Sequence, residues 1–139
     1  MSLSIRNQLP GTVTAITRGE VMATVRIQLT DGRPLTAAIT RDAVDDLALA
    51  TGSAVHALVK STEVSLATAP VEGLSIRNQL PGTITDVTTG GATAAIRITT
   101  DTGDLTAVIT NDAVTDLGLT TGIPVIALIK STEVALATP

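Results

Sequence analysis

The sequence predicts an all-β protein made of two tandem five-stranded barrels, each with one short helix. Two observations lead to this prediction. First, two strings recur unchanged, residues 4–12 as 75–83 and residues 60–64 as 130–134, so the chain contains two copies of one unit. Second, β-branched and apolar residues alternate with polar ones in short runs that turn residues separate, a pattern typical of strands.

The repeat divides the chain into two units. Unit one is expected at residues 3–68 and unit two at 74–138, with 69–73 as a short linker that contains one Pro and one Gly. The offset between the copies is 71 residues at the first string and 70 at the second. We place the lost residue in the turn at 30–34, because surface loops tolerate such changes.

Five strands are predicted in each unit. Alternation and β-branched residues define the first two strands of unit one, and Arg18-Gly19 and Asp31-Gly32 mark turns after them. The third and fourth strands are rich in Ala, Val and Leu, and the fifth is short. The five predicted ranges are 12–17, 23–29, 35–39, 53–60 and 64–67.

A helix is predicted between the third and fourth strands. Thr40 is a suitable N-cap, Ala43, Val44 and Leu47 share one face, and Gly52 follows the end. Unit two repeats this pattern with Thr110, Ala113, Val114, Leu117 and Gly122. Five short strands with a helix after the third is the pattern of an OB-type barrel, although periodicity by itself leaves other small barrels open.

The composition predicts that the units need partners. A unit of this size buries little core by itself, and this chain has 0% aromatic residues and no Cys to compensate. Yet 44% of its residues are hydrophobic and only 16% are charged. We therefore expect the two units to pack together and the chain to oligomerise through surfaces of Val, Ile, Leu and Ala.

Charge and hydropathy exclude several classes of function. The formal net charge of −4 argues against binding nucleic acid or an anionic membrane by bulk electrostatics. No run approaches the 18 or more apolar residues of a membrane span, and the first residues lack the pattern of a signal peptide. A soluble cytoplasmic protein is expected.

The residues for common catalytic sites are missing. The only His, His56, corresponds to Ile126 in unit two, so a strand residue is a better interpretation than a ligand. Without Cys, a thiolate or imidazole metal site is not expected, and neither copy can hold a Ser/His/acid triad. Lys60-Ser61 lacks the glycines of a phosphate-binding loop, and no aromatic residue is available to stack on bases. An enzyme is the least favoured class.

The repeated strings instead predict an oxyanion site. Lys60 and Lys130 are the only lysines, and both begin the second string. Arg, Lys, Ser and Asn supply the donors that a tetrahedral oxyanion needs. Thr40 and Thr110 add to the set, because the helix that follows each presents free N–H groups.

A structural interpretation of the strings stays open. The Arg-Asn segments can be solvated loops before a Pro-Gly turn, and a lysine can protect an exposed strand edge. Elsewhere, however, polar positions differ between the copies, as in Arg18 against Thr89 and Arg41 against Asn111, whereas the two strings are identical. Recent duplication explains part of this identity.

In these motifs the sequence resembles the molbindins, the Mop-type molybdate-binding domains. The family pattern is an opening Ser-x-Arg-Asn-Gln, a central Ala-Ile-Thr and a closing Lys-Ser. In this chain the corresponding segments are 4–13, 38–40 and 60–61 in unit one and 75–84, 108–110 and 130–131 in unit two. Val108 replaces the family's Ala in unit two, a harmless departure. The resemblance extends over the whole chain, because each unit carries the full pattern once. The tandem form without DNA-binding or ATPase segments is most similar to stand-alone storage members.

The resemblance implies an OB-like barrel in each unit and a homotrimer that holds molybdate or tungstate between Mop domains, for storage and without catalysis. The Arg side and the Lys side of one site would come from different units, with Asn7 acting through its backbone. The residues that would surround the anion are Ser4, Arg6, Asn7, Thr40, Lys60 and Ser61 in unit one and Ser75, Arg77, Asn78, Thr110, Lys130 and Ser131 in unit two.

Two alternatives to storage remain at this point. The first is a regulatory module that senses the anion and acts on a partner protein. The second is a purely structural β oligomer in which the motifs are loop residues. The sequence does not choose between molybdate and tungstate, since both are tetrahedral dianions of nearly the same size.

Overall fold

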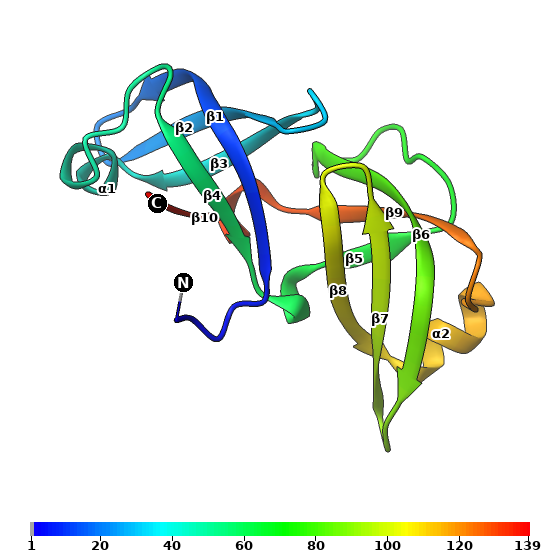
Figure 1. Ribbon diagram of the computed structural model, residues 1–139. Helices are drawn as coiled ribbons and strands as arrows, with labels where there is room; N and C mark the ends of the chain where they lie inside the picture. Colours follow the sequence, from blue (N-terminus) through cyan, green and yellow to red (C-terminus); the bar gives the residue numbers. More distant parts are fainter. Residues whose placement is uncertain (1) are drawn as a thin grey trace.

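The computed structural model describes residues 2–139 and confirms the predicted fold class, with two five-stranded curled sheets and few short helices (Figure 1). The elements of unit one are β1 (Asn7–Arg18), β2 (Met22–Leu29), β3 (Pro34–Thr40), α1 (Arg41–Asp46), β4 (Ala54–Val59), the 3-10 turn η1 (Ser61–Glu63) and β5 (Ser65–Ala67). Those of unit two are β6 (Asn78–Thr89), β7 (Thr93–Thr100), β8 (Gly103–Thr110), α2 (Asn111–Leu117), β9 (Pro124–Ile129), η2 (Ser131–Glu133) and β10 (Ala135–Ala137).

The alternation in the sequence sets the face that each strand buries. In β2 every second residue, from Ala23 to Leu29, is buried, and the residues between them are exposed. β1 pairs with β2 in antiparallel register from Gly11 opposite Leu29 to Arg18 opposite Ala23, with a bulge after Val13. Such a bulge bends a strand, and the same irregularity recurs in β6.

The repeated Pro-Gly pair lies inside a strand and does not form the turn that the sequence indicated. β1 begins at Asn7, so Pro10 and Gly11 are in its middle. Pairing with β2 begins only at Gly11, so no β2 partner requires the N–H that Pro10 lacks. A Cβ on Gly11 would lie 2.5 Å from Ile27 Cγ2 and 2.9 Å from the Gln28 carbonyl oxygen. The glycine therefore permits a close crossing of β1 and β2.

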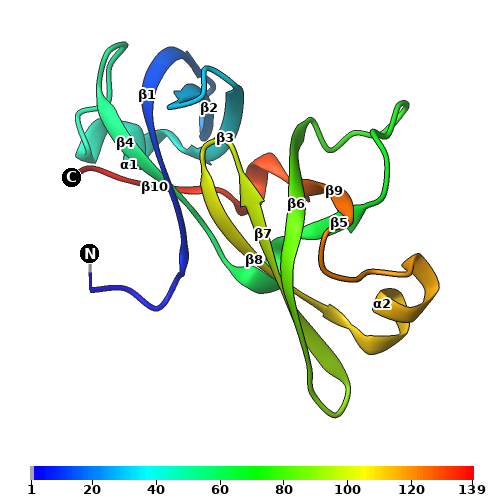
Figure 2. The same cartoon turned by 45° about the vertical axis from the view of Figure 1, so that its right-hand side comes forward.

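The two units exchange their last strands. The strand orders are β10-β4-β1-β2-β3 and β5-β9-β6-β7-β8, so β5 of unit one completes the sheet of unit two, and β10 does the reverse. Both views show β5 beside β9 in unit two and β10 beside β4 in unit one (Figures 1 and 2). The expectation that each barrel uses its own fifth strand was wrong. Each half of the molecule needs the other to complete its sheet.

The predicted helix cap is confirmed in both units. Thr40 Oγ1 accepts a hydrogen bond of 3.1 Å from the Ala43 backbone N–H, and Thr110 Oγ1 accepts one of 3.1 Å from Ala113. Val44 buries its side chain under the sheet. Each helix is only a short turn between the third and fourth strands of its unit.

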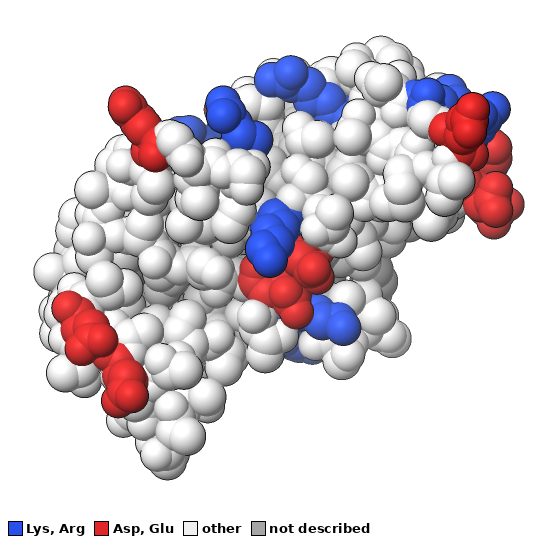
Figure 3. All heavy atoms as spheres, turned by 180° about the vertical axis from the view of Figure 1, so that it is seen from behind, with Lys and Arg blue, Asp and Glu red and all other residues white. Residues whose placement is uncertain are grey.

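The surface carries few charges. On the face that Figure 3 shows, Lys, Arg, Asp and Glu form small separate patches on a largely uncharged surface. This agrees with a chain of which only 16% is charged. Ion pairs in residues 2–139 are at the surface, between Arg18 and Asp45 and between Arg33 and Asp31, where such pairs add little stability.

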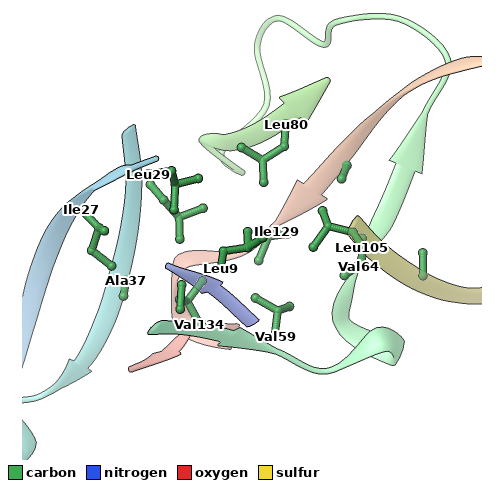
Figure 4. Packing of buried hydrophobic residues seen from close by; sticks show 14 of the residues in the cluster. Leu9, Ile27, Leu29, Ala37, Val59, Val64, Leu80, Leu105, Ile129 and Val134 are labelled. Atoms are coloured by element: carbon green, nitrogen blue, oxygen red, sulfur yellow. The ribbon is translucent and has the colours of Figure 1, made fainter. Parts of the chain in front are cut away.

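The core is continuous across both units. Buried residues from every part of the chain belong to one cluster, including Leu9 and Val59 of unit one and Leu80 and Ile129 of unit two. Figure 4 shows these side chains gathered around the place where the exchanged segments cross. The continuous core confirms that the units pack together, as the small size of each unit predicted.

Candidate anion-binding site

Lys130, Ser131 and Ser75 converge on one hollow of about 280 Å³, which we call the Lys130 hollow. Lys130 follows the last residue of β9 with extended backbone, and Ser131 begins η2. Ser75 comes from the segment before β6, and Ile76 and Thr132 complete the lining. Ser75 begins the first repeated string of unit two and Lys130 begins the second. The structure thus brings together two residues that are 55 positions apart in the sequence.

The equivalent place in unit one has a different lining. Lys60 faces a hollow of about 320 Å³, the Lys60 hollow, together with Ile5 and the chain segment from Thr132 to Ala135 of unit two. Neither Ser4 nor Ser61 lines this hollow, and Glu63 and Glu133 do. The two copies of the motif therefore have unequal surroundings within one chain.

The arginines of the first string lie apart from the lysines. Arg6 lines a hollow of about 270 Å³, the Arg6 hollow, with Arg97, Thr85 and Thr106 of unit two. Arg77 lines another, of about 390 Å³, with Gln79 and the linker segment from Val71 to Leu74. A site with Arg on one side and Lys on the other is therefore not closed within a single chain.

Asn7 and Asn78 have a structural role that the sequence did not indicate. Asn7 Nδ2 donates to the Thr106 carbonyl at 2.8 Å, and its Oδ1 accepts from the Thr106 N–H at 2.8 Å. Asn78 makes the equivalent pair with Thr36, at 2.8 and 2.9 Å. Both side chains are nearly inaccessible, with 1% and 3% of their surface exposed. Each asparagine thus fastens the Arg segment of one unit to the edge strand of the other.

Gln8 and Gln79 were also missed by sequence reasoning. Gln8 Nε2 donates to the Ile5 carbonyl at 2.9 Å, and Gln79 Nε2 donates to the Ile76 carbonyl at 3.1 Å. Gln79 also bonds the backbone of Val71 in the linker. These bonds close the short segment that contains the serine and arginine of each motif. Their only signal in the sequence was that the glutamine is identical in both copies.

Thr40 and Thr110 serve as helix caps in this structure. Their hydroxyls accept from the helix backbone, and both residues are exposed. The first helical N–H groups are also paired: Arg41 donates to the Val21 carbonyl and Asn111 to the Ala92 carbonyl, both at 2.9 Å. Few free N–H groups are left at these helix starts.

The Lys130 hollow is lined by a lysine and by hydroxyl-bearing residues, which suit an anion that only accepts hydrogen bonds. Within residues 2–139, no three or more His, Cys, Asp or Glu side chains gather in a way that would hold a metal ion. In the same part of the chain, no helix combines the length and apolar character needed to cross a membrane.

A family model described as the TOBE domain matches the chain twice, at residues 3–66 and 74–136. Together these ranges cover most of the chain, and each contains one copy of both repeated strings.

Three known proteins are similar over almost the entire chain. A crystal structure of the cytoplasmic molybdate-binding protein ModG with molybdate bound has a TM-score of 0.96, 38% identity and full coverage of both chains. The molybdenum-pterin-binding protein MopA of Rhodobacter capsulatus is 41% identical over 100% of this chain and 53% of its own length. The molybdenum transport protein ModE of Azotobacter vinelandii is 39% identical over 99% of this chain and 51% of its own.

The chain therefore spans about half the length of the curated relatives it matches, and the whole of the ModG chain. The sequence identity and the TM-score with ModG agree with the family match. The chain belongs to the TOBE domain family and carries two Mop-type copies of that domain in tandem.

Proposed function

We propose that this protein binds molybdate and holds it without chemical change, as a cytoplasmic store of the oxyanion. The observation that carries the proposal is the convergence of Ser75, Lys130 and Ser131 on one hollow. The similarity to ModG, a molybdate-binding protein crystallised with molybdate, supports the choice of ligand. Among residues 2–139 no cluster of His, Cys, Asp or Glu could hold a metal ion, which fits binding without metal-assisted chemistry.

The size of the Lys130 hollow suits a small tetrahedral dianion. Its volume of about 280 Å³ exceeds that of one water molecule, about 30 Å³ in the liquid, several times over. A five-atom oxyanion with a few waters fits that space. The lysine supplies charge, and the hydroxyls supply directed donors.

The site is completed in an oligomer under this proposal. Arg6 and Arg77 line other hollows than the lysines do, so a neighbouring subunit supplies the arginine side of each site. The proposed set is Ser4, Arg6, Asn7, Thr40, Lys60 and Ser61 with Ser75, Arg77, Asn78, Thr110, Lys130 and Ser131. Asn7 would act through its backbone, because its side chain binds Thr106. We propose a homotrimer. Native mass spectrometry with added molybdate reports the subunit count and the bound anions together, and a monomer that binds with full affinity would contradict this arrangement.

Titration calorimetry tests the ligand. We expect heat of binding with molybdate and with tungstate, and much weaker binding with sulfate. The donor set does not separate molybdate from tungstate, so similar affinities for the two are expected. No heat with molybdate, or equal affinity for sulfate, would overturn the proposal.

The lysine variants test the site itself. Lys60→Gln combined with Lys130→Gln should weaken molybdate binding by about 2–5 kcal/mol, because each removes a charged partner from a desolvated anion. Arg41→Gln, at an exposed position that the repeat does not preserve, serves as the control and should leave the affinity unchanged. An affinity equal to that of the unaltered protein in the lysine variant would place the lysines in solvent and not at the anion.

A sensing function is the second candidate. The similarity to ModE of Azotobacter vinelandii covers this whole chain and about half of that protein, so the same pair of domains also occurs within a longer protein. A regulatory module would bind a partner protein only with, or only without, molybdate. Pull-down from cell extract in both conditions separates the two functions, because a store predicts the same proteins in both.

A further inference from the structure

Four of the seven arginines occupy positions that the repeat preserves. Arg6 corresponds to Arg77, and Arg26 corresponds to Arg97. The other three, Arg18, Arg33 and Arg41, have no arginine at the matching place. The molybdate site proposed above uses Arg6 and Arg77, but it leaves Arg26 and Arg97 without a role.

The fold brings the two kinds of preserved arginine together across the units. Arg6 of unit one and Arg97 of unit two line the same hollow, the Arg6 hollow of about 270 Å³. Arg97 lies opposite Thr106 in the β7–β8 register, and Asn7 binds the backbone of Thr106 through both atoms of its amide. The buried asparagine therefore holds Arg6 beside Arg97.

The two guanidinium groups form no ion pair with an acid in residues 2–139, although Asp104 and Asp86 lie nearby. Arg6 and Arg97 are exposed, and no ion pair involves either one in residues 2–139. Asp104 also lines the hollow and accepts a hydrogen bond from Thr99 at 3.2 Å. Two arginines and one aspartate leave the lining with a net positive charge, on a protein whose net charge is −4. Two unpaired cations in one hollow repel each other, and an anion between them would relieve that repulsion.

Arg26 and Arg77 form the equivalent pair, which we call the sister pair. The strand register places it in the same way as Arg6 and Arg97. Arg26 lies opposite Thr36 in the β2–β3 register, and Asn78, the neighbour of Arg77, binds the backbone of Thr36. Thr14 Oγ1 donates to the Arg26 carbonyl at 3.2 Å, as Thr85 does to Arg97 at 3.3 Å.

The acids of unit two are absent from the sister pair. Pro34 stands in the place of Asp104, and Ala15 in the place of Asp86, which is the register partner of Arg97. The pair formed by Arg26 and Arg77 therefore has no acid at either matching position, although Glu72 of the linker lines the hollow of Arg77.

We propose that these arginine pairs form a second class of anion site, two per chain, which binds a phosphate-type dianion. It shares Arg6 and Arg77 with the proposed molybdate sites but uses Arg26 and Arg97 in place of the lysines. Two guanidinium forks match the oxygens of a phosphate group, which can accept paired hydrogen bonds from each. A hollow of about 270 Å³ is larger than a free tetrahedral anion, so it also admits the small organic part of a phosphate monoester. The shared chemistry is the phosphate group, free or esterified.

Calorimetry on the full chain, with inorganic phosphate and with glycerol phosphate as separate probes, tests the proposal. Arg26→Gln combined with Arg97→Gln should weaken binding of the probes by about tenfold or more, the loss expected for a charged hydrogen bond. Tighter binding of glycerol phosphate than of phosphate would identify the esterified form, and the reverse order the free anion. Asp104→Asn should strengthen binding at the Arg6 hollow, whereas Arg18→Gln, an exposed residue outside both classes of site, should change nothing.

Molybdate titrations of the same variants separate this proposal from the function proposed above. Arg26→Gln with Arg97→Gln should leave molybdate binding intact, since neither residue lines a lysine hollow. Lys60→Gln with Lys130→Gln should leave phosphate binding intact. Unchanged phosphate affinity in the double arginine variant, with folding verified by its melting temperature, would overturn the second site, and so would the absence of binding of either probe to the unaltered protein.

Discussion

At the scale of single residues, Asn7 and Asn78 take the place that another strand would have at a sheet edge. β3 and β8 are edge strands, and each would leave backbone groups unpaired where the other unit packs against it. The side-chain amide carries one donor and one acceptor, so it pairs with both backbone groups of Thr106 or Thr36 at once. An asparagine in this position joins the two units and closes the edge.

Removing this amide should destabilise the protein. Asn7→Ala is expected to lower the free energy of unfolding by about 1–3 kcal/mol, because it leaves the partly buried N–H and carbonyl of Thr106 without partners. Urea denaturation followed by circular dichroism measures the change. Asn7→Asp keeps the acceptor but sets a carboxylate against the Thr106 carbonyl, so it should be worse at neutral pH and recover in acid. An alanine variant as stable as the unaltered protein would contradict the role.

Asp31 gives a prediction for acid conditions. The backbone N–H of Arg33, 2.9 Å from Asp31 Oδ1, is the main cause that holds the pKa of this carboxyl below its usual 3.8, with a further contribution from the Thr102 hydroxyl. A lowered pKa in the folded state means that the carboxylate stabilises the fold above about pH 4, and that this stabilisation is lost as the pH falls through the folded pKa.

Asp31→Asn should therefore make stability less dependent on pH in the acid range. Asp31 lies in a surface turn, although only 14% of its side-chain surface is exposed, so the difference at neutral pH should be about 1 kcal/mol or less. Thermal unfolding at pH 7 and at pH 3 measures it, with the exposed Asp46→Asn as the matched control. The difference in stability between Asp31→Asn and the unaltered protein should shrink toward pH 3. A difference that grows toward pH 3 would contradict this prediction.

At the scale of elements, the close crossing of the first two strands of each unit depends on a glycine. Gly82 repeats the geometry of Gly11, since a Cβ there would lie 2.5 Å from Ile98 Cγ2 and 2.7 Å from the Thr99 carbonyl oxygen. The carbonyl belongs to the backbone and cannot turn aside as a side chain can. The strands would have to separate to admit a methyl group.

Gly82→Ala is thus expected to cost about 1–3 kcal/mol of stability, the usual cost of forcing extra volume into a packed place. Gly91→Ala is the matched control, because a Cβ on Gly91 would meet no atom within 4 Å, and it should be close to neutral. The midpoints of urea denaturation of the two variants measure the contrast. Equal midpoints would show that the strands can move apart at little cost.

The crossover after β4 is the element that turns two repeats into one molecule. Lys60 has extended backbone and η1 follows at once, so the chain leaves its own sheet and packs η1 on β8 of the other unit. Unit two does the same with η2 on β3. The repeated Lys-Ser-Thr-Glu-Val string lies at this crossover, so its identity in both copies has a structural reason in addition to the proposed binding one.

At the scale of the whole molecule, the exchange of β5 and β10 is reciprocal. β5 pairs with β9 in the same register as β10 pairs with β4. Ser65, Leu66 and Ala67 of β5 lie opposite Leu128, Ala127 and Ile126 of β9. Ala135, Leu136 and Ala137 of β10 lie opposite Leu58, Ala57 and His56 of β4. The two halves are thus interchangeable in geometry.

A fragment of residues 1–70 should therefore form a homodimer and not a monomer. By itself it leaves the outer edge of β4 unpaired and β5 without a sheet, and a second copy supplies both in the same register. Light scattering after size-exclusion chromatography measures the mass, with the full chain as the control. A folded monomeric fragment would mean that β5 can turn back onto its own sheet, and that the exchange is not required.

Much of this protein follows from local patterns in the sequence. Alternation placed the strands and the faces that they bury, Thr40 and Thr110 marked the helix starts, and the small size of each unit implied a shared core. The strings at residues 4–12 and 60–64 led to the family that the TOBE match then showed. These features depend on neighbouring residues and on period, so a single sequence contains them.

Other features depend on contacts between distant segments, and the tertiary structure decided them. The Pro-Gly pair looked like a turn, but the space between β1 and β2 placed it inside a strand. The fifth strand had no local sign of which sheet it joins, and Asn7 could not be assigned to Thr106, which is 99 residues away. The sequence by itself determined which elements form and which family they belong to, because these depend on short-range propensity and on motifs. Only the tertiary structure determined which unit completes which, and hence which charged side chains meet, because pairing between units is set by packing across the whole chain.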